Sequence, residues 1–428
     1  MSERVHQLPE EPNPEIESVV ERYWLLQKAG GLVAPLLTVV LAFFISGIVV
    51  LVTTGSVGDT LQTYKAIFEG TGLSWFFDVG NYNIGLPFTD AKVWFPWNTN
   101  EFESIAAANL QQTLILWVAL VLTGLAVAFA FRCGLFNIGA QGQYLAGSIV
   151  AVLIATELPK VVDLPGWLLI IATVLGGMLA GAAIAGIAGL LKGTVGAHEV
   201  ITTIMLNWIV LWVGSYFFGI GGPFQTDEAG TAGTVPSSAD IVEKAKLFLF
   251  WGDPLLQGVH IGLFAALGAL VVYSLTLNRT TLGYEVRAVG HNPEAARYGG
   301  ISVARNYFLA MAIAGLFAGL AGALDIVGWE FRLDTTQIQG STVGFIGIAV
   351  ALLGRNTAVG VALAALLFAA LQTGTASRNL DPEFFPPDLA SSLAIIIQGL
   401  IVLFVGADII VLLALRRLKR KRGARLTA

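Results

Sequence analysis

Charged residues are scarce in this sequence: they make up 12% of its 428 residues, whereas 55% are hydrophobic. Soluble globular domains carry about 25% charged residues. The shortage of charge, together with a mean hydropathy of +0.74, excludes a water-soluble globule. It indicates a protein that crosses the lipid bilayer several times, and no nucleic-acid partner is expected.

Cysteine and histidine are scarce as well. The single cysteine, Cys133, excludes an intramolecular disulfide and a cysteine-based metal site. The four histidines, His6, His198, His260 and His291, are too dispersed along the chain to suggest a metal cluster. We therefore predict that this chain holds no metal and no bound cofactor.

Enzyme motifs are missing too. The sequence has no GxxxxGK[ST] phosphate loop, no zinc motif, no GxSxG elbow and no plausible catalytic triad. No apolar segment combines an acid, a base and metal ligands, so we predict no catalytic residues and disfavour an integral-membrane enzyme. Asp325 and Asp408 are the only acids in the predicted spans, and intramembrane carboxylates are functional candidates. The chain lacks a series of such groups that could relay protons.

Long apolar runs, by contrast, are abundant. A helix needs about 20 residues to cross a hydrocarbon core of roughly 30 Å. Ten segments are predicted to span the membrane: Leu32–Thr53, Ser104–Phe131, Leu135–Thr156, Trp167–Leu191, Ile201–Gly221, Gly258–Leu277, Tyr307–Val327, Ser341–Gly354, Thr357–Gly374 and Ala390–Leu415. The sequence thus predicts an all-α polytopic membrane protein.

The polar segments divide the chain further. We predict a disordered cytoplasmic tail over 1–28, a transmembrane domain over 29–415 and a basic cytoplasmic tail over 416–428. Within the transmembrane domain, 54–103 and 222–257 are outer insertions, and 278–306 is a cytoplasmic loop. Placing both termini in the cytoplasm puts most of the 24 Lys and Arg residues on the inner side, as the positive-inside rule requires. The first span then serves as an uncleaved signal anchor.

Five spans followed by five spans insert the two halves in opposite directions, as in transporters built from inverted repeats. In such folds, glycine-interrupted segments at matching positions point to the substrate site. The third span of the first half opens with Gly134–Gln143 (GLFNIGAQGQ), and the third span of the second half contains Gly344–Gly354 (GFIGIAVALLG). Spans four and seven also carry small residues at helical spacing, which let helices approach closely: Gly177, Gly181, Ala185 and Gly189, and Gly315, Gly319 and Ala323.

Four amides lie in apolar spans, where an uncompensated amide is costly. They are Asn137, Gln141, Gln143 and Asn207. For any single one of these amides, we expect an interhelical hydrogen bond that holds the bundle. Taken as a cluster, they favour the lining of a path for a polar solute. Glu199, which precedes the fifth span, either favours a helix N-terminus or forms an inner gate.

The segment Arg279–Arg305 predicts a short helix between two spans. Asn292 suits the cap, Pro293 the first helical position and Glu294 the positive end of the helix dipole, while two glycines after Tyr298 end the helix. Six helical residues are unstable alone in water, so lipid headgroups or another protein must pack against them. Charge alone favours an ordinary basic cytoplasmic loop, whereas the two caps favour a protein partner. Because the chain lacks its own phosphate loop, we expect that partner to be an ATPase.

Four motifs resemble those of a known family: FNIGAQGQ at 136–143, HEVITTIMLNWI at 198–209, TxxGxxxRAVGxNPEAARYGGI at 280–301 and GIAVALLGRN at 347–356. Over about residues 111–408, the chain resembles the permease subunits of bacterial ABC importers of the simple sugar and nucleoside (branched-chain amino acid/ribose-like) family. Within that family it is most similar to the nucleoside type. The long polar tail and the large outer insertions depart from the usual pattern.

The resemblance implies a multi-pass permease in the bacterial cytoplasmic membrane that moves a small polar solute inward by alternating access. The implied partners are an ABC ATPase that uses the ATP, a second and non-identical permease, and an extracytoplasmic substrate-binding lipoprotein. The implied ATPase-coupling residues are Gly283, Arg287, Ala288, Gly290, Asn292, Pro293, Glu294, Ala295, Ala296 and Gly300.

Three alternatives remain open. A sugar permease would use the same amide-lined path as a nucleoside permease. A permease for branched-chain amino acids would need charged or helix-terminal groups for a zwitterion. A secondary transporter or channel would keep the inverted repeat and work without an ATPase.

Overall fold

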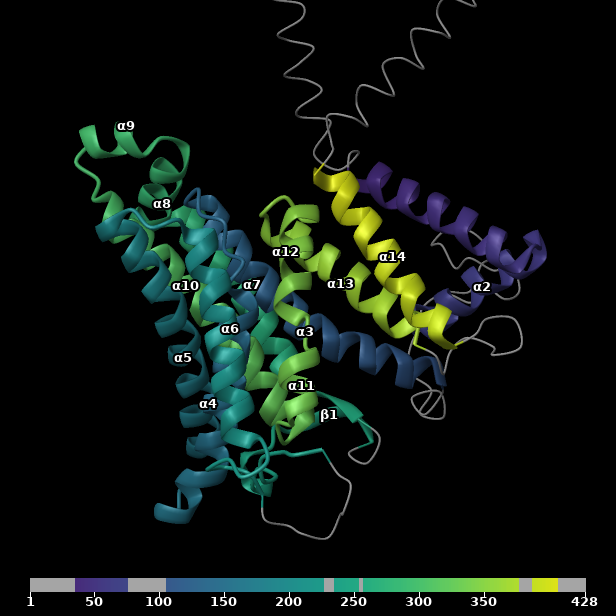
Figure 1. Cartoon of the computed structure of the whole chain (residues 1–428), viewed down its shortest axis with the longest axis horizontal. Coiled ribbons are helices and arrows are strands. Elements are labelled where there is room, and N and C mark those ends of the chain that lie inside the picture. Colours follow the sequence, from purple (N-terminus) through teal and green to yellow (C-terminus); the bar gives the residue numbers. More distant parts are fainter. Residues whose placement is uncertain (1–34, 76–104, 227–234, 254–256, 377–386, 407–428) are drawn as a thin grey trace, which may run out of the picture.

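The structure, a computed structural model, describes residues 35–75, 105–226, 235–253, 257–376 and 387–406. Figure 1 shows the arrangement of the helices that make up most of these ranges. The first half contains the helix Pro35–Thr54, α2 (Val57–Gly70), the 3₁₀ turn η1 (Leu73–Trp75), α3 (Ile105–Arg132), α4 (Ala140–Val161), α5 (Gly166–Val195) and α6 (Glu199–Phe218). The predicted tails 1–28 and 416–428 lie outside the described residues.

The second half begins after a short stretch of mixed structure. That stretch holds the 3₁₀ turn η3 (Glu243–Ala245) and an antiparallel hairpin of β1 (Leu249–Asp253) and β2 (Gln257–His260). The helices that follow are α7 (Gly262–Arg279), α8 (Thr281–His291), α9 (Pro293–Tyr298), α10 (Val303–Asp325), the π-helical turn η4 (Ile326–Glu330), α11 (Thr335–Gly340), α12 (Val343–Leu353), α13 (Ala358–Gly374) and α14 (Pro387–Gly406).

The prediction of an all-α polytopic membrane protein is confirmed. Among the described residues, eight helices are long and apolar enough to cross a membrane. Two shorter apolar helices, Ala358–Gly374 and Ile395–Val405, stand where the ninth and tenth spans are predicted. Helices α8 and α9 lie at one end of the bundle, and β1 lies at the opposite end (Figure 1).

Three local features differ from the sequence expectations. The third span is helical only from Ala140, because residues before it form turns after Gly134, whose φ is +75°. The eighth span is preceded by a separate short helix, α11, and a two-residue break precedes α12. The cytoplasmic loop holds a second helix, α8, which Thr280 caps by accepting a hydrogen bond from Gly283 N.

The contacts between helices follow the two-half organisation. In the first half, α4 and α5 both pack on α10 of the second half; in the second half, α12 and α13 both pack on α3 of the first. Each half thus places its third and fourth spans against the second span of the other half. This exchange is the arrangement expected for two inverted five-helix halves, and it puts α3 and α10 at the centre.

The two predicted small-residue stripes face each other. A Cβ atom added to Gly181 on α5 would lie 2.4 Å from the backbone oxygen of Gly315 on α10. One added to Gly319 would lie 2.3 Å from the backbone oxygen of Gly177. Backbone therefore packs directly on backbone along the α5–α10 interface, which is how helices gain van der Waals contact inside a bilayer.

We expect Gly181→Ala to destabilise the protein by about 1–3 kcal/mol, because the added methyl group overpacks this interface. The measurement is thermal unfolding of the purified protein in detergent. Gly268→Ala on α7 is the matched control, since a Cβ atom there meets nothing within 4 Å. Equal stability of the two variants would contradict the close α5–α10 contact.

Candidate functional site

The first helix break, before α4, is held by three amide side chains. The Asn207 side chain on α6 accepts a hydrogen bond from Gly142 N at 2.8 Å and donates one to Ile138 O at 3.0 Å. Asn137 and Gln143 pair amide to amide, at 3.0 and 2.9 Å. Helix ends leave backbone groups unpaired, and lipid supplies no hydrogen bonds to them. Asn207 bonds two of these groups, and the Asn137–Gln143 pair lies beside them.

The second break, before α12, is held by Gln141. Its Nε2 donates to Ser341 O at 2.9 Å, and its Oε1 accepts from Gly344 N at 2.8 Å. One side chain on the first turn of α4 therefore satisfies both sides of the break between α11 and α12. Gly134–Gln143 and Gly344–Gly354, the two segments at matching positions of the two halves, are therefore in contact.

All four predicted pathway amides are buried, and the hydrogen bonds described for them go to protein groups. None of the four lines the cavity described next. Their assignment to the solute pathway stays a prediction, and this conformation gives them a role in holding the helix breaks.

A cavity of about 240 Å³ lies beside the second break. This volume is slightly below the roughly 300–1,000 Å³ typical of small-molecule sites, so it suits a small solute. Its lining residues come from α3, α4, α10, η4, α11, α12 and α13: Ile115, Leu116, Ala119, Leu120, Tyr144, Asp325, Trp329, Glu330, Gln337, Gly340, Ser341, Val343 and Gln372.

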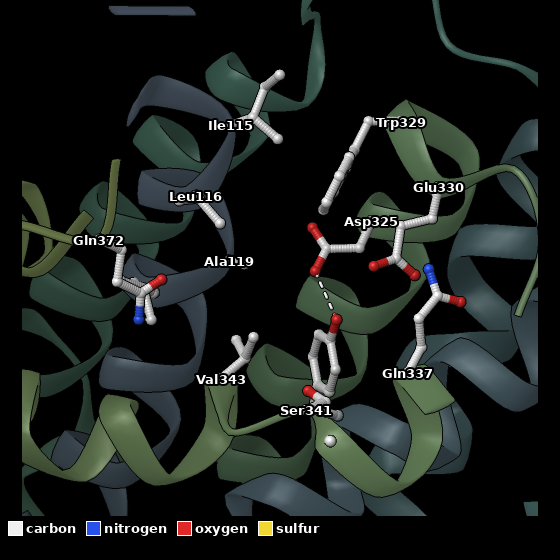
Figure 2. A pocket seen from close by; sticks show the side chains of 13 residues that line it. Ile115, Leu116, Ala119, Asp325, Trp329, Glu330, Gln337, Ser341, Val343 and Gln372 are labelled. Carbon is white, nitrogen blue, oxygen red and sulfur yellow. Dashed lines mark hydrogen bonds between the residues drawn. The ribbon is translucent and has the colours of Figure 1, made fainter. Parts of the chain in front are cut away.

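The two sides of the cavity differ in chemistry. Figure 2 shows Leu116, Ala119 and Val343 on one side, where Gln372 adds a single amide, and Asp325, with Glu330 beyond it, on the other. Asp325 is only 3% exposed, and its Oδ2 accepts a hydrogen bond of 2.7 Å from the hydroxyl of Tyr144 on α4. The cavity therefore offers an apolar surface opposite a polar, acidic one.

The π-helical turn η4 continues α10 and brings Trp329 and Glu330 to the cavity beside Asp325. Such turns occur often at functional sites because they redirect side chains. Backbone bonds from the segment before β1 fix this turn: Leu247 N donates to Val327 O, and Ile241 N donates to Phe331 O, both at 2.8 Å.

The cavity lies beside the middle of α3, one of the helices long and apolar enough to span a membrane. Leu120 is 12 residues from Arg132 at the end of α3, which corresponds to about 18 Å at the usual helical rise of 1.5 Å per residue. Half of a hydrocarbon core of roughly 30 Å is of similar depth. Transporters with inverted repeats bind their solutes at this level.

The sequence identified part of this cavity. Asp325 was a candidate as an intramembrane carboxylate. Gln372 is an amide in a predicted apolar span, so the cost of an uncompensated amide marks it as a candidate in the same way as the other four. Trp329 and Glu330 fall beyond the predicted end of span seven at Val327, and no sequence pattern indicates that a π-helical turn returns them to the cavity.

The short helix α9 forms as predicted, from Pro293 to Tyr298. Asn292 caps it by accepting a hydrogen bond of 3.1 Å from Ala295 N, and Glu294 and Ala295 are exposed. Ala296 is buried at 5% exposure. Helix α9 therefore anchors one face on this chain and leaves the opposite face free.

The remaining predicted coupling residues join α8 and α9 to the bundle. Gly283 lies at the start of α8, where Arg287 Nε donates to its carbonyl at 3.3 Å, and Ala288 is half-buried. Gly290 packs flat on the end of α3, since an added Cβ atom would lie 2.3 Å from the Arg132 backbone oxygen. Gly300 follows α9 with a φ of +82°.

Three elements meet at Asn356, in the turn between α12 and α13. The Arg132 guanidinium at the end of α3 donates two hydrogen bonds to Asn356 O, at 3.1 and 2.7 Å. The hydroxyl of Tyr273 on α7 donates a third, at 2.7 Å. Since α8 also packs on the end of α3, this junction connects α8 and α9 to α3 and α12, both of which line the cavity.

Glu199, the predicted gate, lies at the first position of α6. Its carboxylate forms a 2.8 Å ion pair with Lys192 near the end of α5.

Cys133, at the same end of the bundle, is buried, and burial raises the pKa of its thiol to about 12. Among the described residues, no group of three or more His, Cys, Asp or Glu side chains could hold a metal ion.

The comparison with protein families identifies the family of this chain. The model of the family described as "Branched-chain amino acid transport system / permease component" matches residues 109–406. The chain belongs to this permease family. The resemblance predicted from the four motifs is confirmed, and the chain is a multi-pass membrane protein.

Three relatives show what this permease is similar to. It is 36% identical to the nucleoside ABC transporter permease protein NupB of Lactococcus lactis subsp. cremoris, over 75% of this chain and 85% of that protein. It is 39% identical to the guanosine ABC transporter permease protein NupP of Bacillus subtilis, over 70% and 82%. It is 37% identical to the glucose ABC transporter permease protein TsgB13 of Haloferax volcanii, over 69% and 76%. The predicted function, the permease subunit of an ABC importer, is confirmed.

We expect Asn207→Leu to lower the stability of the permease, because it leaves Gly142 N–H and Ile138 C=O without partners in the membrane. Each buried unpaired group costs about 1–3 kcal/mol. Thermal unfolding in detergent measures the effect, and Met205→Leu on the exposed face of the same helix is the control. Unchanged stability with a loss of transport would contradict the structural role and favour the pathway role.

Proposed function

We propose that this permease moves nucleosides inward and that its solute site is the cavity between α3 and η4. The observation that carries the proposal is the pairing of an apolar surface with a polar one that holds Asp325, Trp329 and Glu330. A nucleoside has a flat base that packs on apolar and aromatic groups, and it has N–H and hydroxyl donors for the polar surface. The names of the relatives NupB and NupP support this choice.

The cavity disfavours the amino-acid alternative. A branched-chain amino acid carries a carboxylate, whose strongest partner is a cation, and the N-terminus of α12 at Val343 offers this cavity only a partial positive charge. The lining residues include two acids and no Lys, Arg or His. A buried carboxylate without such a partner is costly. A hexose would satisfy the polar surface but leave much of the apolar surface unfilled, which makes a sugar the second candidate.

The exposed face of α9 is the proposed docking surface for an ABC ATPase, which would use the ATP. The proposed partners are that ATPase, a second non-identical permease and an extracytoplasmic substrate-binding lipoprotein. This places α8 and α9 on the cytoplasmic side of the bacterial plasma membrane, together with both termini. The chain itself acts as a transport subunit without ATPase activity or a bound cofactor.

Alternating access would follow from the junction at Asn356. The ATP-bound and ATP-free states of the ATPase must favour different permease conformations. A partner that binds two conformations with equal affinity does not shift the equilibrium between them. A movement of α9 passes through Gly290 to the end of α3, and through Arg132 to the turn between α12 and α13. Both α3 and α12 line the cavity, so the movement changes its access.

Glu294→Lys should leave membrane insertion intact and reduce solute-stimulated ATP hydrolysis in the assembled complex to the unstimulated rate. The substitution reverses the charge on the exposed face of α9 and opposes the helix dipole. Glu157→Lys, a charge reversal at the exposed end of α4, is the control. Normal stimulated turnover in the Glu294 variant would refute the docking assignment.

Trp329→Ala should raise the half-saturating nucleoside concentration for ATP-dependent uptake about tenfold, since stacking is worth about 1–3 kcal/mol per base. Uptake into vesicles that hold the complete complex measures this. Trp212→Ala, at an exposed tryptophan on α6, is the control. If hexoses or branched-chain amino acids are transported and nucleosides are not, the proposed substrate class is wrong.

A further inference from the structure

The turn between α5 and α6 is exposed and has little packed against it. Residues 196–198 connect the two helices. Gly196 has a φ of +71°, and a Cβ atom added there would meet nothing within 4 Å. The buried residues of α6 form one stripe along the helix: Thr203, Asn207, Val210, Gly214 and Phe218. The turn itself therefore does not fix the angle between α5 and α6.

An ion pair spans this turn. Lys192 Nζ, in the last turn of α5, lies 2.8 Å from Glu199 Oε2, in the first turn of α6. The two side chains are 26% and 12% exposed, so this pair is screened less than an exposed pair such as Glu157–Lys160. His198 Nδ1 is 4.0 Å from the same oxygen, and the exposure of its side chain makes it a weaker partner. The Lys192–Glu199 pair thus fixes the angle that the turn leaves open.

The start of α6 contacts the first helix break. A Cβ atom added to Gly139 would lie 3.0 Å from the Cβ atom of Thr203, one turn after Glu199. Asn207, one turn further on, bonds two backbone groups of the break. A shift of α6 therefore moves the side chain on which the break depends.

The end of α5 is connected to α9 through α10. Ile301 N, just before α10, donates to Ala296 O on α9 at 3.0 Å. The first turn of α10 packs on the last turn of α5, where a Cβ atom added to Gly193 would lie 2.9 Å from Ala304 O. Backbone contacts this close leave little room for the two helix ends to slide past each other. A movement of α9 would therefore displace the end of α5 that carries Lys192.

We propose that the Lys192–Glu199 pair makes α6 move together with α5 and α10, so that a movement of α9 also reaches the first helix break. This inference rests on the proposed docking of an ATPase on α9, and it adds a second route to the one through Arg132. Lys192 and Glu199 are positioning residues, because neither needs to touch the solute. Without the pair, α6 turns at Gly196 and no longer follows α9. ATP is then hydrolysed without a matching amount of transport.

Glu199→Lys should lower the amount of nucleoside taken up per ATP hydrolysed about fivefold, because two cations then face each other across the turn. Lys192→Glu should do the same with two carboxylates. The double variant Lys192→Glu/Glu199→Lys restores the attraction and should return the ratio to within about twofold of the wild type. Lys192→Arg and the control Lys160→Glu, in the exposed ion pair on α4, should keep the wild-type ratio. Uptake of tritiated guanosine or uridine and ATP hydrolysis are measured in vesicles that hold the complete complex.

The ratio separates this role from a merely structural one. A variant that only destabilises the protein lowers uptake and solute-stimulated hydrolysis together and leaves their ratio unchanged. If Glu199 acts only as an acid at a helix N-terminus, Lys192 is not required. The double variant would then be worse than either single variant, since both new charges oppose the helix dipoles.

A distance measurement on the intact ion pair tests the inference even if the charge variants do not fold. Cys133 is the single cysteine of the chain. Spin labels can therefore be attached at Leu179→Cys on α5 and Val213→Cys on α6, both exposed positions, in a Cys133→Ala background. We expect one narrow distance distribution that stays the same when the complex binds a non-hydrolysable ATP analogue. Adding Glu199→Lys should broaden it.

Three results would overturn the inference. They are a label distance that differs between the two nucleotide states, an unchanged ratio of uptake to hydrolysis in a folded Glu199→Lys complex, and a double variant no better than the single ones. Failure of the wild-type complex to take up either nucleoside, or to hydrolyse ATP faster when one is present, would instead contradict the proposed function.

Discussion

Backbone groups freed inside a membrane must find partners within the protein, and this constraint governs the centre of the permease. Two predicted spans are interrupted, one before α4 and one before α12. Lipid offers no hydrogen bonds there. Asn207 and Gln141 supply them, each with one amide that both donates and accepts. The breaks are stable because these amides are present, and a polar cavity can exist beside them because the breaks are stable.

One of these amides also connects the two halves of the molecule. Gln141 joins α4 of one half to α12 of the other, next to cavity residue Ser341. At the opposite end of α12, Arg132 joins the turn before α13 to α3. The start of α12, which Gln141 holds, lies beside the cavity, and the far end of α12 lies at the end of the bundle that carries α8 and α9. In the proposed mechanism, a movement of α9 reaches the cavity through helices instead of a loop.

Much of this architecture could be predicted from the sequence, because apolar length determines the spans and Asn292 with Pro293 determines the start of α9. The burial of the four amides also followed from their setting. Whether such an amide faces solute or backbone depends on long-range partners, such as Ser341 for Gln141, which local patterns do not encode. The cavity was missed for the same reason. It depends on a π-helical turn that is held by a segment about 80 residues earlier in the chain.

The account centres on a nucleoside held between the α3 surface at Leu116 and Ala119 and the carboxylate of Asp325. The most direct measurement is a cryo-electron microscopy structure of the assembled transporter, determined with guanosine and a non-hydrolysable ATP analogue. We predict ligand density in this cavity, between Leu116 and Ala119 on one side and Asp325 on the other. Density among Asn137, Gln143 and Asn207, or between two permease subunits and away from Asp325, would contradict the account.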